Sequence, residues 1–178
     1  MTITVLGTVA TPLLRSSVAA GDTLYVTGAL GASAAALRAL LGGRQPSPAH
    51  RARFARPVPR LTEARWLAGN GATAGIDVSD GLLAELGHLA AASGVRISLD
   101  DSAVPVAAGA SLDDALEGGE EYELVVAGRR IDVAAFEAAH GLTLTAIGIA
   151  LTVEPGALPG VDVSARVGRR GGHDHLSG

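Results

Sequence analysis

Two aspartates and a serine lie within one short stretch, Asp77-Val-Ser79-Asp80, that is followed directly by a glycine. Residues 75–78 are typical of the end of a buried strand, and leucines recur at helical spacing from residue 82 to residue 89. The stretch therefore lies where a strand turns into a helix. At such a point the first N–H groups of the helix lack backbone partners, and the helix dipole favours negative charge.

The sequence leaves two interpretations of this turn open. Asp77 and Asp80 repel each other unless a cation lies between them. A magnesium ion bridging to phosphate oxygens fits, because Mg²⁺ prefers a few carboxylates together with substrate oxygens. In the other interpretation, Ser79 or Asp80 caps the helix and Asp77 is a solvated strand end.

The amino-acid composition excludes several kinds of catalytic and binding site. The chain has 178 residues and is 48% hydrophobic, which is enough for one folded domain. All 14 basic residues are arginines, so a P-loop lysine and a Schiff-base lysine are excluded. Cysteine is absent, which excludes disulfides, thiolate metal ligands and a cysteine nucleophile. If the chain binds a phosphate group, arginine side chains, backbone N–H groups or a metal ion must hold it.

Several classes of partner are disfavoured. A net charge of −4 and an aromatic content of 3% argue against nucleic acid binding. Apolar runs are short and broken by Gly, Pro or Arg, and no basic region followed by an apolar one opens the sequence. We therefore expect a cytoplasmic protein without a nucleic acid or membrane partner.

Strand and helix patterns alternate along the chain, which predicts an α/β (α+β) fold with a mixed β-sheet packed with helices. Strands are expected at residues 2–9, 23–27, 75–78, 95–99, 122–127 and 142–150. Helices are expected at residues 32–41, 60–68, 81–93, 112–116 and 132–140. Residues 44–60 hold four prolines and five arginines and are expected to form an extended connector; a basic patch for nucleotide phosphates is the alternative.

A second cluster of carboxylates occurs in the run Gly118-Gly-Glu120-Glu121-Tyr-Glu123-Leu124, which enters a strand directly. Solvated edge charges account for one or two of the three glutamates, and the two glycines allow backbone to approach a ligand closely. Asp100 and Asp101 are expected to be turn residues, with a second acidic site as the alternative. His173-Asp-His175 near the end suggests either a mobile polar terminus or a metal site.

Taken together, these stretches resemble the C-terminal domain of bacterial thiamine-monophosphate kinase, in the superfamily of aminoimidazole ribonucleotide synthetase. The resemblance covers nearly the whole chain in order and spacing. The matching stretches are Gly21-Asp-x-x-Tyr-Val-Thr-Gly28, Arg56-Pro-x-Pro-Arg60, Ile76-Asp-Val-Ser-Asp-Gly-Leu82, Leu86-Gly-His88, Gly118-Gly-Glu-Glu-Tyr-Glu-Leu124 and Asp174-His175.

The resemblance implies ATP-dependent phosphorylation of thiamine phosphate to thiamine diphosphate with Mg²⁺. A phosphate oxygen attacks and is already ionised, so no dedicated strong base is implied. The roles implied by matched position are Asp77 and Asp80 as magnesium ligands, Arg15 and Ser79 as ATP contacts, and Glu120 and His173 as contacts of thiamine phosphate.

The chain also departs from the family pattern. The family enzyme is longer, and its N-terminal domain carries an acidic cluster that holds most of the magnesium. Residues 1–16 are therefore expected to be the last strand and linker of a missing N-terminal domain, and residues 17–178 the C-terminal kinase domain. Its expected partner is the missing domain or a split counterpart, with a homodimer as the full enzyme, and the chain alone should be inactive.

Three substitutions depart from the motifs themselves. Glu121 replaces an aspartate of the family, and His173 and Leu176 replace aromatic residues, which weakens the expected stacking on thiamine. Two other hypotheses stay open. One is another ATP-dependent superfamily member, such as a selenophosphate synthetase or a hydrogenase-maturation relative. The other is a catalytically dead domain that binds a partner or a nucleotide.

Overall fold

A six-stranded mixed sheet forms the centre of the computed structural model, which describes residues 4, 6–9 and 11–164. The strand order is β2-β4-β1-β5-β3-β6, and every neighbouring pair is antiparallel except β3 and β6. The strands are β1 (Thr23–Thr27), β2 (Ala74–Asp77), β3 (Arg96–Leu99), β4 (Leu124–Gly128), β5 (Leu144–Leu151) and β6 (Gly160–Val163). The expected fold class is confirmed.

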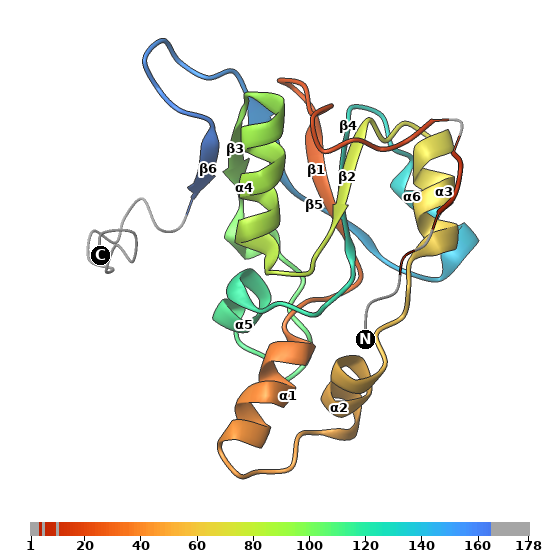
Figure 1. The fold of residues 1–178 in the computed structure, drawn as a ribbon, viewed down its shortest axis with the longest axis vertical. Helices are drawn as coiled ribbons and strands as arrows, with labels where there is room; N and C mark the ends of the chain where they lie inside the picture. Colours follow the sequence, from red (N-terminus) through yellow and green to blue (C-terminus); the bar gives the residue numbers. More distant parts are fainter. Residues whose placement is uncertain (1–3, 5, 10, 165–178) are drawn as a thin grey trace.

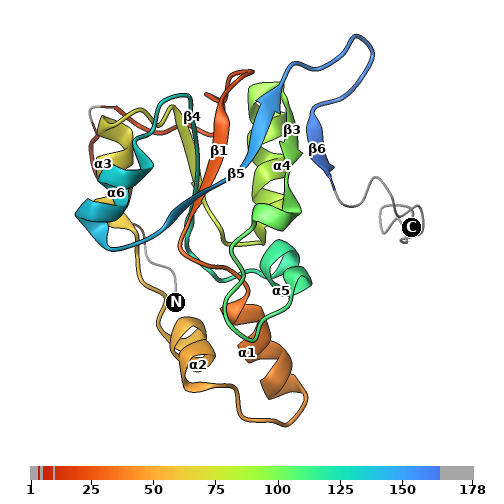
Figure 2. The same cartoon turned by 180° about the vertical axis from the view of Figure 1, so that it is seen from behind.

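Helices cover both faces of this sheet and extend beyond one end of it (Figures 1 and 2). The helices are α1 (Ala32–Leu41), α2 (Pro48–Ala55), α3 (Leu61–Gly69), α4 (Leu82–Ser93), α5 (Leu112–Glu117) and α6 (Val133–His140). Figure 1 shows α3 and α6 together on one side and α4 near β3 and β6, while α1 and α2 lie below the sheet.

The sheet separates two hydrophobic cores, and successive side chains of β1 point alternately into one and the other. Successive side chains of a strand point to opposite faces. Leu24 and Val26 belong to the larger core, which also contains Leu86 of α4. Tyr25, between them, belongs to a smaller core that contains Leu67 of α3 and Phe136 of α6. The single sheet therefore has one buried layer against α4 and α5 and another against α3 and α6.

One predicted connector is in fact partly helical. Residues 48–55 form α2, so the expectation of an extended segment over residues 44–60 was wrong for this part. The Ser47 hydroxyl accepts a hydrogen bond from the His50 N–H at 3.2 Å, and Pro48 occupies the first helical position. This is a helix start in which serine supplies the cap and proline pre-sets the backbone angle.

The first and the last described segments differ from the prediction. Residues 4 and 6–9 are described but form no strand, and the side chains of Leu6 and Val9 are exposed. A strand is stabilised by hydrogen bonds to a neighbour, and none pairs with these residues here. Conversely, β6 was not predicted; it pairs in parallel with β3 and forms one edge of the sheet.

Asp100 caps a short 3₁₀ turn, Asp101–Ala103, which confirms the turn interpretation of the Asp100-Asp101 pair. Within the described residues, none of the helices is both long and apolar enough to cross a bilayer.

Candidate functional site

The strand-to-helix turn that carries Asp77, Ser79 and Asp80 is present as predicted. β2 ends at Asp77, and α4 starts at Leu82 after Gly81, whose φ is 111°. Neither Ser79 nor Asp80 caps the helix, because the N-cap position is Gly81 and no side chain bonds to it. Asp77 is half-buried and Asp80 exposed, and within the described part of the chain neither carboxylate takes part in an ion pair.

A buried glutamate, Glu85, stabilises this turn through hydrogen bonds. Glu85 is 2% exposed; its Oε1 accepts hydrogen bonds from the Ser79 hydroxyl at 3.0 Å and from the Asp80 N–H at 3.1 Å. Its Oε2 lies 3.0 Å from Nδ1 of His88. Burial by itself raises the pKa of Glu85, but the hydrogen bonds from His88, Asp80 and Ser79 outweigh it and lower that pKa. The Ser79 proton is therefore directed inward.

Sequence reasoning missed Glu85, although a signal for it exists. Leu82, Leu86 and Leu89 define the apolar face of α4, and Glu85 lies three residues after Leu82 on that face. A carboxylate on a buried stripe must be paired or hydrogen-bonded to be tolerated. Its partners had to come from the preceding turn, which is where the motif residues lie.

The run from Gly118 to Leu124 lies directly beside this turn. The Glu120 N–H donates to the Ser79 carbonyl at 2.8 Å, and the Tyr122 N–H donates to the Val78 carbonyl at 2.9 Å. A side chain at Gly118 would collide with Ala34 and the Asp114 backbone, and one at Gly119 with the Ser79 carbonyl. The two glycines thus allow close approach of the chain to itself, and the expectation that they let backbone approach a ligand stays a prediction.

Residues alternate in this run between exposed and buried positions. Glu120 and Tyr122 have positive φ angles of 61° and 54°, a left-handed conformation that costs about 1–2 kcal/mol for each non-glycine residue. The Tyr122 hydroxyl donates to the Glu120 carboxylate at 2.7 Å. Glu121 and Glu123 are fully buried, so the interpretation as solvated edge charges holds only for Glu120.

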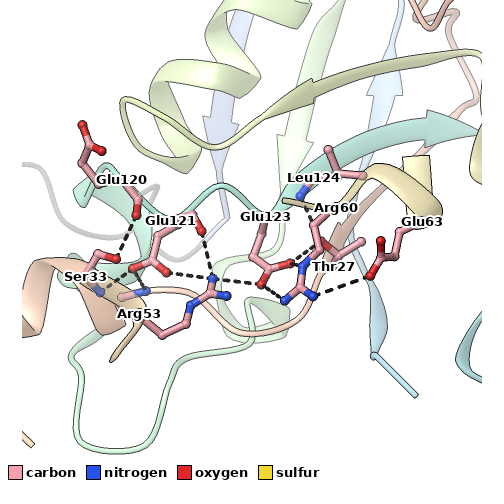
Figure 3. Close-up of polar contacts among 10 residues, drawn as sticks. Thr27, Ser33, Arg53, Arg60, Glu63, Glu120, Glu121, Glu123 and Leu124 are labelled. Atoms are coloured by element: carbon pink, nitrogen blue, oxygen red, sulfur yellow. Dashed lines mark hydrogen bonds and ion pairs between the residues drawn. The ribbon is translucent and has the colours of Figure 1, made fainter. Parts of the chain in front are cut away.

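Figure 3 shows the network that receives the two buried glutamates, with the Glu120 side chain pointing away from it. The Glu121 carboxylate accepts hydrogen bonds from the N–H groups of Gly31 and Ser33, at 2.9 and 2.8 Å, at the start of α1. Burial raises the pKa of Glu121 despite these bonds and the nearby Arg53 guanidinium.

Glu123 is the centre of the other half of this network. Arg60 donates to it through two nitrogens, at 2.9 and 2.6 Å, and the Thr27 hydroxyl donates at 2.6 Å. Arg53 lies 2.9 Å from the same carboxylate. The hydrogen bond to Glu123 raises the pKa of Arg60. Since removing one partner of a buried ion pair costs much more than the pair contributes, these residues fix one arrangement of the run.

Arg15 lies apart from the Ser79 turn. The Arg15 carbonyl accepts a hydrogen bond from the Ser93 hydroxyl at 2.9 Å, so the Arg15 backbone lies at the C-terminal end of α4. A helix of 12 residues is about 18 Å long, which separates this end from the Ser79 turn. His173, Asp174, His175 and Leu176 lie outside the described residues.

Asp77 and Asp80 are the two carboxylates predicted to bind magnesium. Among the described residues, no group of three or more His, Cys, Asp or Glu is arranged to hold a metal ion. Asp77 and Asp80 nevertheless fit Mg²⁺ when substrate oxygens complete the shell, because that ion keeps few protein ligands in phosphate sites.

The pKa of Tyr122 is raised, and the largest cause is its hydrogen bond to Glu120. The negative charges of Glu120, Asp77 and Asp80 add to this effect.

A groove of about 420 Å³ opens next to Glu120. Its apolar lining comes from α1 and α2, and residues 117–120 line it as well. The apolar residues are Ala34, Leu37, Leu41 and Phe54. Two acidic residues, Glu117 and Glu120, and one basic residue, Arg38, also line the groove. Its volume lies within the range of small-molecule sites, which typically combine an apolar wall with a few polar groups.

A family model described as AIR synthase related protein, C-terminal domain, matches residues 19–155. The thiamine-monophosphate kinase of Methanopyrus kandleri is 42% identical over 128 residues, which cover 66% of this chain and 41% of that protein.

Two solved structures are similar in fold. Thiamine-monophosphate kinase from Stenotrophomonas maltophilia K279a aligns with a TM-score of 0.77 and 33% identity, over 86% of this chain and 53% of that one. AaThiL complexed with AMPPCP and TMP aligns with a TM-score of 0.70 and 29% identity, over 85% of this chain and 50% of that one. The chain thus spans about half the length of these relatives or less.

Proposed function

Because the chain belongs to the AIR synthase related proteins, whose C-terminal domain matches residues 19–155, we propose that it forms the C-terminal half of a thiamine-monophosphate kinase. The complete enzyme would transfer a phosphoryl group from ATP to thiamine phosphate and form thiamine diphosphate. One observation carries the proposal. The 2.8 Å hydrogen bond between the Glu120 N–H and the Ser79 carbonyl brings the two acidic motifs to a single site.

Each site residue has a proposed role. Asp77 and Asp80 would hold Mg²⁺, which when bound neutralises the phosphate oxygens of the two substrates as they approach. Glu120 would contact thiamine phosphate at the mouth of the groove, where its carboxylate complements a cationic ring. Ser79 would contact an ATP phosphate after its hydroxyl turns away from Glu85, since both the phosphate and Glu85 are acceptors.

The remaining roles need more than the described residues. Arg15, at the far end of α4, would reach the nucleotide only if ATP extends along this helix, and His173 would contact thiamine phosphate from the tail. The proposal also includes an N-terminal domain, or its split counterpart, as the source of further magnesium ligands. A homodimeric full enzyme and a cytoplasmic location complete it; light scattering of the reconstituted enzyme and cell fractionation would test these two points.

The alternative function is that of a domain that binds a partner or a nucleotide without turnover. The two functions differ in one result: phosphoryl transfer after addition of an N-terminal half supports the kinase, whereas binding without transfer supports the alternative.

Calorimetric titration tests the proposal directly. Thiamine phosphate is titrated into the chain with Mg²⁺ and a non-hydrolysable ATP analogue, alone and with the N-terminal half of the Methanopyrus kandleri kinase. We expect binding in the mixture, and its loss in Asp80→Asn. Asp100→Asn is the matched control, because an asparagine retains the cap of the 3₁₀ turn. Binding that survives Asp80→Asn would contradict the site, and absence of binding in both cases would contradict the substrate.

A further inference from the structure

We propose that Arg53 is a positioning residue of the substrate site: it holds Glu120 and Tyr122 in their left-handed conformations and keeps Phe54 at the groove. The identity of the site rests on the proposed function. The contacts that carry the inference lie among residues of this chain alone, so they can be tested without a ligand.

The first contact is to the backbone between the two left-handed residues. Nη2 of Arg53 donates a hydrogen bond to the carbonyl of Glu121 at 2.9 Å. Glu120 and Tyr122, on either side of Glu121, both have positive φ. Non-glycine residues keep such angles only where the surroundings over-determine them. Arg53 supplies a fixed donor at the peptide between Glu121 and Tyr122.

The second contact is to the charge of Glu121. Its carboxylate is fully buried and lies 3.4 Å from Nη2 of Arg53, the one cation paired with it among the described residues. The N–H groups of Gly31 and Ser33 bond to the same carboxylate but do not neutralise it. Glu123, in contrast, is paired with both Arg60 and Arg53. Loss of Arg53 therefore leaves Glu121 as the buried charge without a counterion.

Arg53 is also connected to the groove through its own helix, α2. The only buried residue of α2 is His50, whose Nε2 lies 2.9 Å from the Ala108 carbonyl. Because α2 has no fully buried apolar residue, polar contacts contribute to holding this eight-residue helix in addition to its packing against α1. Phe54 follows Arg53 on α2 and lines the groove, with 37% of its surface exposed. The guanidinium that holds the Glu120 run therefore also fixes one wall of the groove.

The reach of arginine suits this position. One atom, Nη2, lies within 3.4 Å of the Glu121 carbonyl, the Glu121 carboxylate and the Glu123 carboxylate, and Figure 3 shows the guanidinium lying between Glu121 and Glu123. A lysine ammonium is a compact charge on a stem that is one bond shorter, so it keeps the charge but does not place its donors at the same point.

Hydrogen–deuterium exchange of the full chain, followed by NMR, provides the test. In Arg53→Met, exchange at the amides of Glu120 and Tyr122 should accelerate by about tenfold or more, because a charged hydrogen bond and its counterion are lost. Arg60→Met is the matched control: it also removes one guanidinium from Glu123 but has no contact with Glu121. We expect the control to lower the melting temperature while changing exchange at these amides by less than about threefold.

Two outcomes would overturn the inference: wild-type exchange in Arg53→Met, or equal acceleration in both variants. If Arg53→Met does not fold, Arg53→Lys, which keeps the charge, replaces it, and we expect the same local acceleration; wild-type exchange there would contradict the need for arginine. Thiamine phosphate is then titrated into the same proteins with their N-terminal partner. Absence of binding in the wild type would count against the proposed function, while the exchange result would still decide the role of Arg53.

Discussion

Tyr122 and Glu120 form an exposed hydrogen-bonded pair at the edge of the acidic site. The bond from the phenol to the carboxylate is the largest cause of the raised pKa of Tyr122, and the charges of Asp77 and Asp80 add to it. The folded state therefore retains this proton more firmly than the unfolded state. The resulting stabilisation is present below the ordinary value of 10.0 and is lost as the pH rises through the folded pKa.

Replacement of this carboxylate tests the pair. In Glu120→Gln we expect the Tyr122 pKa to fall toward its ordinary value, because the charge and the strong acceptor are both removed. Ultraviolet absorbance of tyrosinate, measured in a Tyr25→Phe background, reports this residue alone. Glu154→Gln, which removes a charge outside the site, should leave the titration unchanged; an equal fall there would argue against a local cause.

Glu85 supports the turn that carries Ser79 and Asp80. We expect Glu85→Ala to reduce the free energy of unfolding by about 1–3 kcal/mol, because the Ser79 hydroxyl and the Asp80 N–H lose a charged acceptor. His88→Ala removes only an exposed partner and should cost less than about 1 kcal/mol. Urea unfolding curves of the two variants provide the comparison. Equal losses would mean that the turn does not depend on Glu85.

At the scale of elements, the close approach of the Gly118-Gly119 segment to the Ser79 turn sets the geometry of the site. Gly119→Ala places a methyl group against the Ser79 carbonyl, so we expect a loss of about 1–3 kcal/mol of unfolding free energy. Gly69, at the end of α3, has open space around it, and alanine there should be neutral or stabilising by about 0.5–1 kcal/mol. Thermal unfolding distinguishes the two, and a tolerated Gly119→Ala would show that the segments are able to separate.

Helices and strands were predictable where they depend on the pattern of neighbouring residues. The bounds of β1 and α1 agree with those expected from the alternation of residues 23–27 and the alanine and leucine pattern of residues 32–41. α2 was missed because the four prolines of residues 44–60 suggested an extended chain, although Ser47-Pro48 is a helix start. β6 was missed because four residues carry little periodicity, and its pairing with β3 comes from a segment about 60 residues away.

On the scale of the whole molecule, apolar side chains remain exposed along α1 and α2. Leu37, Leu41 and Phe54 line the groove and are 44%, 80% and 37% exposed. Contiguous apolar surface of this kind typically marks an interface or a ligand site. An N-terminal domain, thiamine phosphate or a second copy of the chain would each cover part of it.

We expect the chain alone to self-associate at high concentration through this surface. Multi-angle light scattering should show a mass that rises with concentration, and Leu37→Ser combined with Leu41→Ser should reduce that rise. Leu158→Ser is a control, because this leucine is 78% exposed but lies outside the groove. A constant monomer mass in the wild type would contradict the prediction.

The sequence by itself determined the alternation of strands and helices, the strand-to-helix turn with Asp77 and Asp80, and the family resemblance, because each depends on neighbouring residues or on a short motif. Only the tertiary structure decided which acidic residues face outward. Glu120, Glu121 and Glu123 look equivalent as a string, yet left-handed angles expose the first and direct the others to Arg53 and Arg60. Those partners lie 63 or more residues away, and a buried charge is tolerated only where the fold brings its counterion to it.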